Sequence, residues 1–204
     1  MPEPVGPWLV VGLGNPGPAY ARTRHNVGQM VLDVLAARQQ SSQQPSRQPS
    51  WRRDRSGRAD VVAGRLGDPP GVRAVLARPR SYMNESGGSV STLLSFYQVS
   101  LEQLVVVHDE LDLPYGTLRV KVGGGDNGHN GLRSLRRSLA TGDFCRVRIG
   151  VGRPQGRQDA ADFVLAPFTT VERADLDLQL QIAADAVESL VSVGLAHTQS
   201  RFNG

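Results

Sequence analysis

The sequence predicts a single α/β domain in which a twisted, mixed β-sheet carries helices on both faces. Short apolar runs alternate along the chain with segments whose apolar residues recur at helical spacing, a succession typical of this class. The chain has 204 residues, enough for one domain with a substantial core. It contains no internal repeat. We therefore expect one domain over residues 1–204.

The first strand and helix of this domain are predicted near the N-terminus. An apolar run over residues 9–13 indicates a buried strand, which ends at the Gly-Asn-Pro-Gly turn of residues 14–17. Apolar residues then recur at helical spacing from residue 27, and Asn26 is a favourable N-cap. His25 is thus expected just outside the positive end of a helix, where a cation is disfavoured. A neutral imidazole there is a candidate catalytic base.

The other elements follow from the same patterns. Residues 39–58 are rich in Ser, Gln, Pro and Arg and are predicted to form a disordered surface loop. The loop from residue 152 should become a short helix by residue 166. Strands are expected over residues 59–63, 72–77, 104–107, 117–122 and 144–151, and longer helices over residues 84–97, 131–139 and 176–190.

Polar residues follow the most apolar of these strands. The run LVVV (104–107) ends in His108-Asp109-Glu110-Leu111-Asp112. Open α/β sheets place their ligand sites at such strand ends. We therefore expect a site here.

Composition limits the compartment and the partners. Cys145 is the single cysteine, which excludes an internal disulfide and fits a reducing cytoplasm. The N-terminal MPEPVGPW lacks the layout of a signal peptide, and no apolar run is long enough to suggest a membrane span. The net charge is +4, with a sequence pI near 9.8. This balance is compatible with a polyanionic partner.

A basic surface is predicted from three segments. Arg133, Arg136 and Arg137 share the polar side of the helix at 131–139. Alone, this would be an ordinary solvated helix face. Neighbouring strands add Arg119, Lys121, Arg146 and Arg148, and together these residues predict a patch that contacts phosphates.

The motifs also bear on dinucleotide binding, a metal site and covalent catalysis. Gly12-x-Gly14-x-x-Gly17 matches the dinucleotide fingerprint, but that motif requires its helix to begin at the glycines, and here helical spacing starts near Asn26. The chain has four histidines, no His-x-x-x-His pair and one cysteine. This set disfavours a zinc site. Mg²⁺ at the Asp-rich turn stays an alternative. Without a Gly-x-Ser-x-Gly elbow, covalent catalysis has little support.

Five motifs in order resemble bacterial-type peptidyl-tRNA hydrolase. They are GLGNPGPAYARTRHNVG, PRSYMNESG, HDELDLPYG, GGGDNGHNGLRS and RVRIGVGRP, and the resemblance extends over residues 9–190 except for the poorly matching 39–58. It implies an esterase that cuts the bond between a peptide and the 3′ ribose of tRNA. It also implies a cytoplasmic monomer that uses no cofactor, metal or covalent intermediate.

The resemblance also implies roles for individual residues. His25 resembles the general base, and Asp109 the carboxylate that orients it. Asn15 and Asn84 resemble amides that hold the peptide backbone and nearby water. Asn130, with His129 beside it, resembles the residue that positions water and the tRNA end. Tyr20 and Met83 would line the cleft, residues 152–168 resemble a mobile lid, and the acceptor stem would face Arg119, Lys121, Arg133 and Arg148.

One departure from the family and one alternative remain. Asn127 stands where the family's loop has Gly or Ala, which leaves the local backbone conformation open. Plastid splicing factors are similar to this family, so a non-catalytic RNA-binding relative is the alternative function. The joint presence of Asn15, His25, Asn84, Asp109 and Asn130 argues against it, because RNA binding alone needs neither a base nor its carboxylate.

Overall fold

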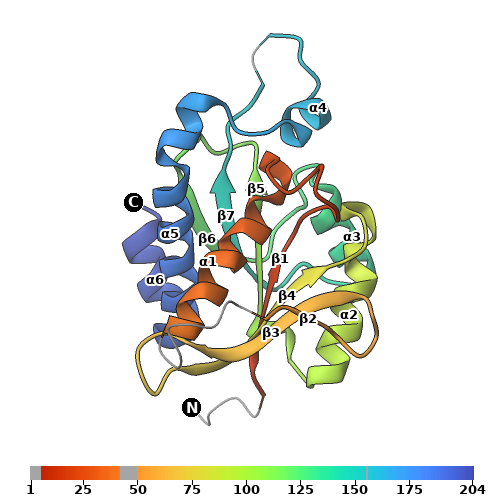
Figure 1. The fold of residues 1–204 in the computed structure, drawn as a ribbon, viewed down its shortest axis with the longest axis vertical. Coiled ribbons are helices and arrows are strands. Elements are labelled where there is room, and N and C mark those ends of the chain that lie inside the picture. The colour runs from red at the N-terminus through yellow and green to blue at the C-terminus, as the bar shows by residue number, and fades with distance from the viewer. Residues whose placement is uncertain (1–5, 42–49, 155) are drawn as a thin grey trace.

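The computed structural model describes residues 6–41, 50–154 and 156–204. Seven strands form one sheet in the order β2-β3-β4-β1-β5-β7-β6 (Figure 1). The central strands β4, β1, β5 and β7 run parallel, whereas β2, β3 and β6 are antiparallel to their neighbours. The predicted mixed sheet is therefore confirmed. The strands are β1 (Trp8–Gly12), β2 (Arg52–Arg53), β3 (Ala59–Leu66), β4 (Val72–Pro79), β5 (Leu104–Glu110), β6 (Leu118–Val122) and β7 (Cys145–Gly150).

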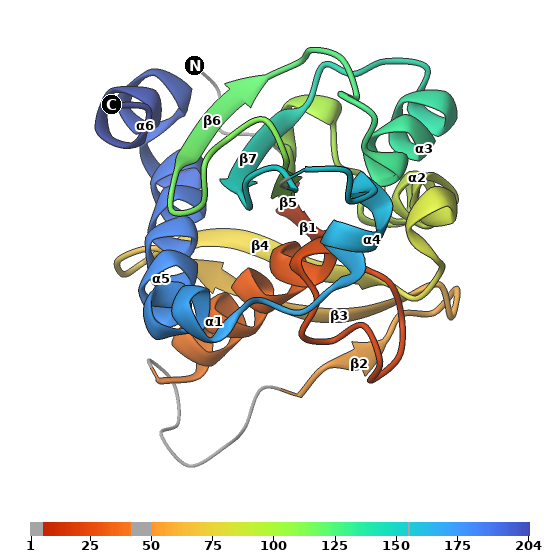
Figure 2. The same ribbon diagram turned by 90° about the horizontal axis from the view of Figure 1, so that it is seen from above.

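Helices cover both faces of the sheet, as Figure 2 shows from above. One face packs against α1 and α5, and the other against α2 and α3. Alternate residues of β1 belong to the two cores: Val10 faces α1 and α5, while Leu9 and Val11 face α2 and α3. The helices are α1 (Val27–Ser41), α2 (Ser86–Tyr97), α3 (Asn130–Leu139), α4 (Ala160–Leu165), α5 (Thr170–Val193) and α6 (Leu195–Phe202).

Two glycines bring α1 close to the centre of the sheet. A Cβ on Gly28 would lie 2.2 Å from the carbonyl oxygen of Val107, and one on Gly12 would lie 2.5 Å from the carbonyl oxygen of Gly28. Both positions therefore require glycine. The Gly-x-Gly pattern at the end of β1 serves helix–sheet packing here. The helix begins at Val27, ten residues beyond Gly17, unlike the arrangement of a dinucleotide site.

Several elements differ from the sequence predictions. The segment at residues 39–58 was predicted as a loop, but α1 extends to Ser41 and β2 pairs with β3; residues 42–49 lie outside the described residues. β5 extends beyond the expected residues 104–107, so that His108, Asp109 and Glu110 form the C-terminal end of the strand.

Helix α6 was not predicted, and Gln199 from this helix and Asn203 directly after it occupy the free edge of β6. The Asn203 amide accepts from Val120 N–H and donates to Val120 C=O. These bonds satisfy groups that an edge strand would otherwise expose. Among the described residues, none of the helices is both long and apolar enough to cross a membrane.

Candidate active site

Two segments far apart in the chain bring His25 and Asp109 together. His25 lies in a 3-10 turn (Arg24–Asn26) that leads into α1, and Asp109 lies near the C-terminal end of β5. The Nδ1 atom of His25 is 2.9 Å and 3.0 Å from the two carboxylate oxygens of Asp109. Both side chains are buried. Because Asp109 binds Nδ1, the proton of a neutral His25 is held there and Nε2 keeps its lone pair.

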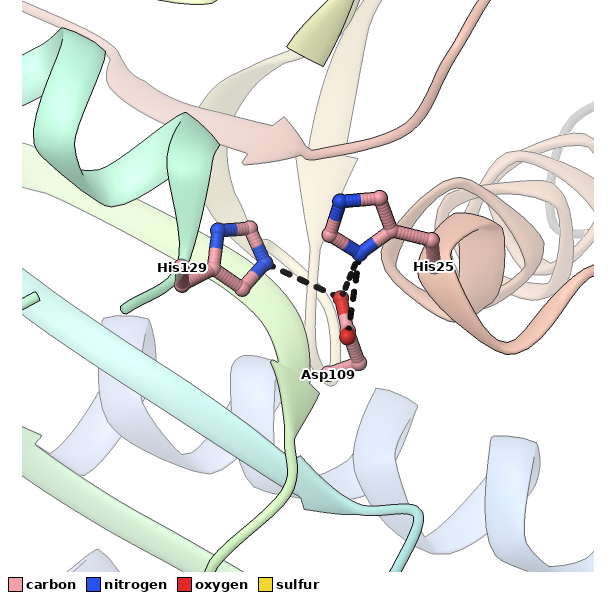
Figure 3. Close-up of side chains that lie close together, drawn as sticks. All are labelled: His25, Asp109 and His129. Carbon is pink, nitrogen blue, oxygen red and sulfur yellow. Dashed lines mark hydrogen bonds and ion pairs between the residues drawn. The ribbon is translucent and has the colours of Figure 1, made fainter. Parts of the chain in front are cut away.

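His129 forms a second hydrogen bond to the same carboxylate. Its Nε2 lies 2.9 Å from Asp109 Oδ1, and its Nδ1 accepts from the backbone N–H groups of Gly131 and Leu132 at the start of α3. The N-cap contact requires an unprotonated Nδ1, so the proton of neutral His129 is on Nε2 and is donated to Asp109. Figure 3 shows both rings directed at one carboxylate.

These contacts shift the protonation equilibria of the cluster. Burial alone would raise the pKa of Asp109, but the charges and hydrogen bonds of His25 and His129 outweigh it and hold that pKa far below its usual range. For His25 burial has the opposite sign and lowers the pKa. The charge and hydrogen bond of Asp109 raise it by more, so the net pKa lies above 6.5. The ionised carboxylate therefore outweighs the cost of burying a charged imidazole.

The expected N-cap role of Asn26 is replaced by a different contact. α1 begins at Val27, directly after Asn26, but the Asn26 side chain accepts from the N–H of Asn15 and donates to its C=O, each at 2.9 Å. The Asn15 side-chain oxygen in turn accepts from the N–H of Met83. This oxygen contact fixes the orientation of the Asn15 amide, and its NH₂ group is left for the cavity that Asn15 lines.

A cavity of about 690 Å³ opens beside the cluster. His25 lines it, and the Nε2 atom of His25 points away from Asp109 (Figure 3). Figures 1 and 2 show α4 lying over this end of the sheet, and α4 supplies Val164 and Leu165 to the lining. The predicted site residues that line the cavity are Asn15, His25, Met83, Asn84, Asp109, His129 and Asn130.

Tyr20 is placed differently from its prediction. It is not among the described lining residues; its ring contacts that of Tyr82 edge-on, with centroids 6.4 Å apart. Tyr82 is 55% exposed and does line the cavity. Sequence reasoning missed Tyr82 and Arg153, which also lines the cavity. Tyr82 directly precedes Met83, and Arg153 lies within the predicted lid, and these positions could have indicated both residues.

The possible ligand atoms of His25, Asp109 and His129 lie within 4.8 Å of one another, a spacing that a metal ion could bridge. The two ring nitrogens are at hydrogen-bond distance from the carboxylate. His129 Nε2 must carry a proton, because its other nitrogen accepts from the α3 backbone. A protonated ring nitrogen has no lone pair for a metal. The geometry thus fits a hydrogen-bonded acid–base cluster.

The basic residues divide into exposed and internally bound groups. Arg133 is exposed on α3, with its side chain 3.3 Å from Asn130 Oδ1, and Lys121 is half-buried on β6. Arg119 donates to the Gly204 carbonyl, and Arg148 is paired with Glu110 at 2.9 Å. The prediction that Arg146 joins a phosphate-contacting surface is wrong, since the side chain is buried. Its guanidinium donates to three carbonyls, those of Gly124, Gly125 and Gly142.

Asn127 adopts a left-handed conformation in the glycine-rich loop. Its φ is 48°, and its amide nitrogen lies 3.4 Å from Glu110 Oε2. Asn tolerates this region better than most residues other than Gly. The departure from the family's loop is therefore accommodated without moving the neighbouring His129 from Asp109.

The α/β sheet, with a buried carboxylate that orients an imidazole beside a cavity, is typical of an acid–base hydrolase. Comparisons with known proteins specify the class. The family model for peptidyl-tRNA hydrolase matches residues 9–204, and the chain therefore belongs to the peptidyl-tRNA hydrolase family, whose members are enzymes.

Similar proteins support this assignment over nearly the full length. A peptidyl-tRNA hydrolase of Frankia casuarinae is 56% identical over 198 residues, covering 97% of this chain and 94% of the relative. One of Streptomyces coelicolor is 54% identical, with 97% and 95% covered. The crystal structure of peptidyl-tRNA hydrolase from Acinetobacter baumannii aligns with a TM-score of 0.83 and 34% identity, covering 97% of this chain and 95% of that one.

Proposed function

We propose that this chain hydrolyses the ester bond between peptide and tRNA in peptidyl-tRNA, with His25 as general base. The observation that carries the proposal is the contact of Asp109 with Nδ1 of His25, which leaves the unprotonated Nε2 of a cavity-lining residue to accept a proton. Family membership supplies the substrate class. The relatives are named for this substrate.

The reaction needs one water molecule and no covalent intermediate. Nε2 of His25 takes a proton from water as the water oxygen bonds to the ester carbonyl carbon. Asp109 stabilises the imidazolium that forms, and His129 keeps that carboxylate in place. The tetrahedral intermediate then collapses, the bond to the ribose 3′ oxygen breaks, and the imidazolium returns its proton to that oxygen. The products are a free peptide acid and tRNA.

The cavity residues suit a substrate whose peptide sequence varies. Asn15, Asn84 and Asn130 line the cavity, and their amides donate and accept without charge, as peptide groups require. Met83, beside them in the lining, offers an adaptable apolar surface. These residues are proposed to hold the peptide backbone and the attacking water. Uncharged amides offer little stabilisation to the charged α-amino group of free aminoacyl-tRNA, so free aminoacyl-tRNA should be a poor substrate.

Four basic residues, one exposed and three half-buried, are proposed to contact the acceptor stem. Arg133 adjoins Asn130, which lines the cavity, so a phosphate bound at Arg133 would lie near the bond to be cut. Lys121 and Arg119 extend the basic surface along β6. Arg148, on the neighbouring strand, would have to exchange its partner Glu110 for a phosphate to take part. We further propose that the enzyme acts as a monomer in the cytoplasm, where peptidyl-tRNA arises, and that residues 152–168 form a lid over the cavity.

The function is tested with N-acetylated aminoacyl-tRNA in the presence of EDTA. Release of free tRNA supports the proposal and its independence from a divalent metal. Binding of the substrate without release would instead identify a non-catalytic RNA-binding relative. A requirement for added Mg²⁺ would contradict the proposed chemistry.

A further inference from the structure

Arg24, which precedes His25 in the same turn, is buried and directed away from the cavity, into the junction between α4 and α5. Its side chain is 3% exposed. Nη1 lies 2.8 Å, 3.3 Å and 3.5 Å from the carbonyl oxygens of Pro167, Ala166 and Phe163. These carbonyls are at the C-terminal end of α4, where the helix dipole favours a cation.

The same guanidinium reaches the start of α5. Nη2 of Arg24 lies 2.6 Å from Oε2 of Glu172, and this carboxylate also accepts from the N–H of Thr169 in the capping box of α5. The Phe163 ring stacks against the guanidinium, with its centroid 4.3 Å from Cζ of Arg24. One side chain therefore joins three segments: the turn of His25, the end of α4 and the beginning of α5.

Backbone contacts run parallel to this side chain. The N–H of Arg24 donates to Ala166 C=O at 3.1 Å, and Thr23 forms an isolated β-bridge with Pro167. The turn that carries His25 is thus attached directly to the segment that follows α4. α4 lines the cavity with Ala160, Ala161, Val164 and Leu165. A displacement at its C-terminal end would therefore also move the turn that carries His25.

We propose that Arg24 is a positioning residue, which fixes the C-terminal end of α4 to the turn of His25. It thereby holds the cavity wall formed by α4 at a fixed position relative to the imidazole of His25. The Arg24 side chain bonds to residues outside the cavity lining, namely Phe163, Ala166, Pro167 and Glu172, so it acts through the segments it joins. The kinetic part of this inference rests on the proposed hydrolase function.

The test compares Arg24→Gln with a matched variant, Arg38→Gln. Arg38 also links the N-terminal part of the chain to α5, through Asp185 and Glu188, but it lies at the far end of α1 from His25. Hydrogen exchange of the amides of residues 160–168 is measured together with kcat and KM for N-acetylated aminoacyl-tRNA, on enzyme whose folded fraction is known from its circular dichroism.

Arg24→Gln should accelerate exchange in α4 and lower kcat of the folded enzyme by about tenfold or more, because small misplacements of reacting groups have effects of this size. KM should change less than kcat, and the pH at half-maximal rate should stay that of the wild type. Arg24→Lys keeps the charge but loses the planar fork, so its kcat and its exchange rate in α4 should lie between those of the wild type and Arg24→Gln. Arg38→Gln should change neither exchange in α4 nor kcat.

Phe163→Leu provides a second variant, because Arg24→Gln could fail to fold. It leaves every hydrogen bond of Arg24 available and removes only the aromatic contact, so the same changes should occur to a smaller extent. Full kcat in a folded Arg24 variant would overturn the inference, as would a lower kcat without faster exchange in α4. Exchange is read without substrate, so failure of the wild type to release tRNA would refute the proposed function alone.

Discussion

The Asp109 cluster and the basic surface represent two opposite ways of arranging charge. In the cluster, one buried carboxylate receives hydrogen bonds from two imidazoles, and a third partner, the α3 backbone, fixes the second ring. On the basic surface, Arg133 is 62% exposed and its nearest carboxylate, Asp126, is 3.9 Å away. The cluster is therefore preorganised for the proposed chemistry, whereas the proposed contacts with a polyanion would be separate and individually weak.

The largest effect is expected at the centre of the cluster. His25→Ala removes the proposed base while Asp109 keeps its bond to His129. We expect kcat to fall by about 10²-fold or more, the scale of a lost general base. Affinity for tRNA, measured by filter binding, should change little because His25 is buried. Turnover at the wild-type rate would remove His25 from the chemistry.

A smaller effect is expected at His129, which has a structural and a positioning contact. His129→Ala loses both the N-cap of α3 and the bond to Asp109, so it should lower kcat and cost about 1 kcal/mol of stability. His129→Asn keeps a capping oxygen but is too short to reach the carboxylate. It should unfold near the wild-type temperature and still lose about tenfold in kcat, as for one hydrogen bond to a charged group.

An equal activity of His129→Asn and wild type would show that His25 alone positions Asp109. Steady-state kinetics and thermal unfolding on the same preparations separate the two contacts.

The smallest effects are expected on the basic surface. Arg133→Ala or Lys121→Ala should weaken tRNA binding a few-fold and reduce the slope of log affinity against log salt by about 1. Hydrolysis of a short ester without tRNA should be unaffected. Arg146→Ala is the contrasting variant: its guanidinium holds the carbonyls of Gly124 and Gly125, so it should lower stability. If its salt slope fell as for Arg133, the division between exposed and structural arginines would be wrong.

Sequence patterns predicted the architecture well where periodicity is strong. The apolar run at 104–107 and the alternation at 144–151 located β5 and β7. Helix α6 was missed because its apolar residues are few, and β2 was missed because a pair of arginines has no strand signal. Its pairing depends on β3, a contact distant in sequence.

The candidate site was predictable as a set of residues but only partly as a geometry. The family motifs named His25, Asp109 and His129, yet they did not indicate that both rings share one carboxylate. The alternation of β7 placed Arg146 and Arg148 on one face. It did not indicate that the glycine-rich loop encloses Arg146 or that Glu110 neutralises Arg148. Such facts depend on where loops pack, which local patterns do not encode.

The most direct test of the account is the pH dependence of kcat for the wild type and Asp109→Asn. His25 must be neutral to act as a base, so turnover should rise with pH through the His25 pKa, which Asp109 holds above 6.5 in the wild type. Without the carboxylate's charge, burial lowers that pKa. The account predicts an acid limb shifted to lower pH and a reduced plateau. An acid limb at the same pH in both proteins would contradict the pairing of His25 with Asp109 as the catalytic base.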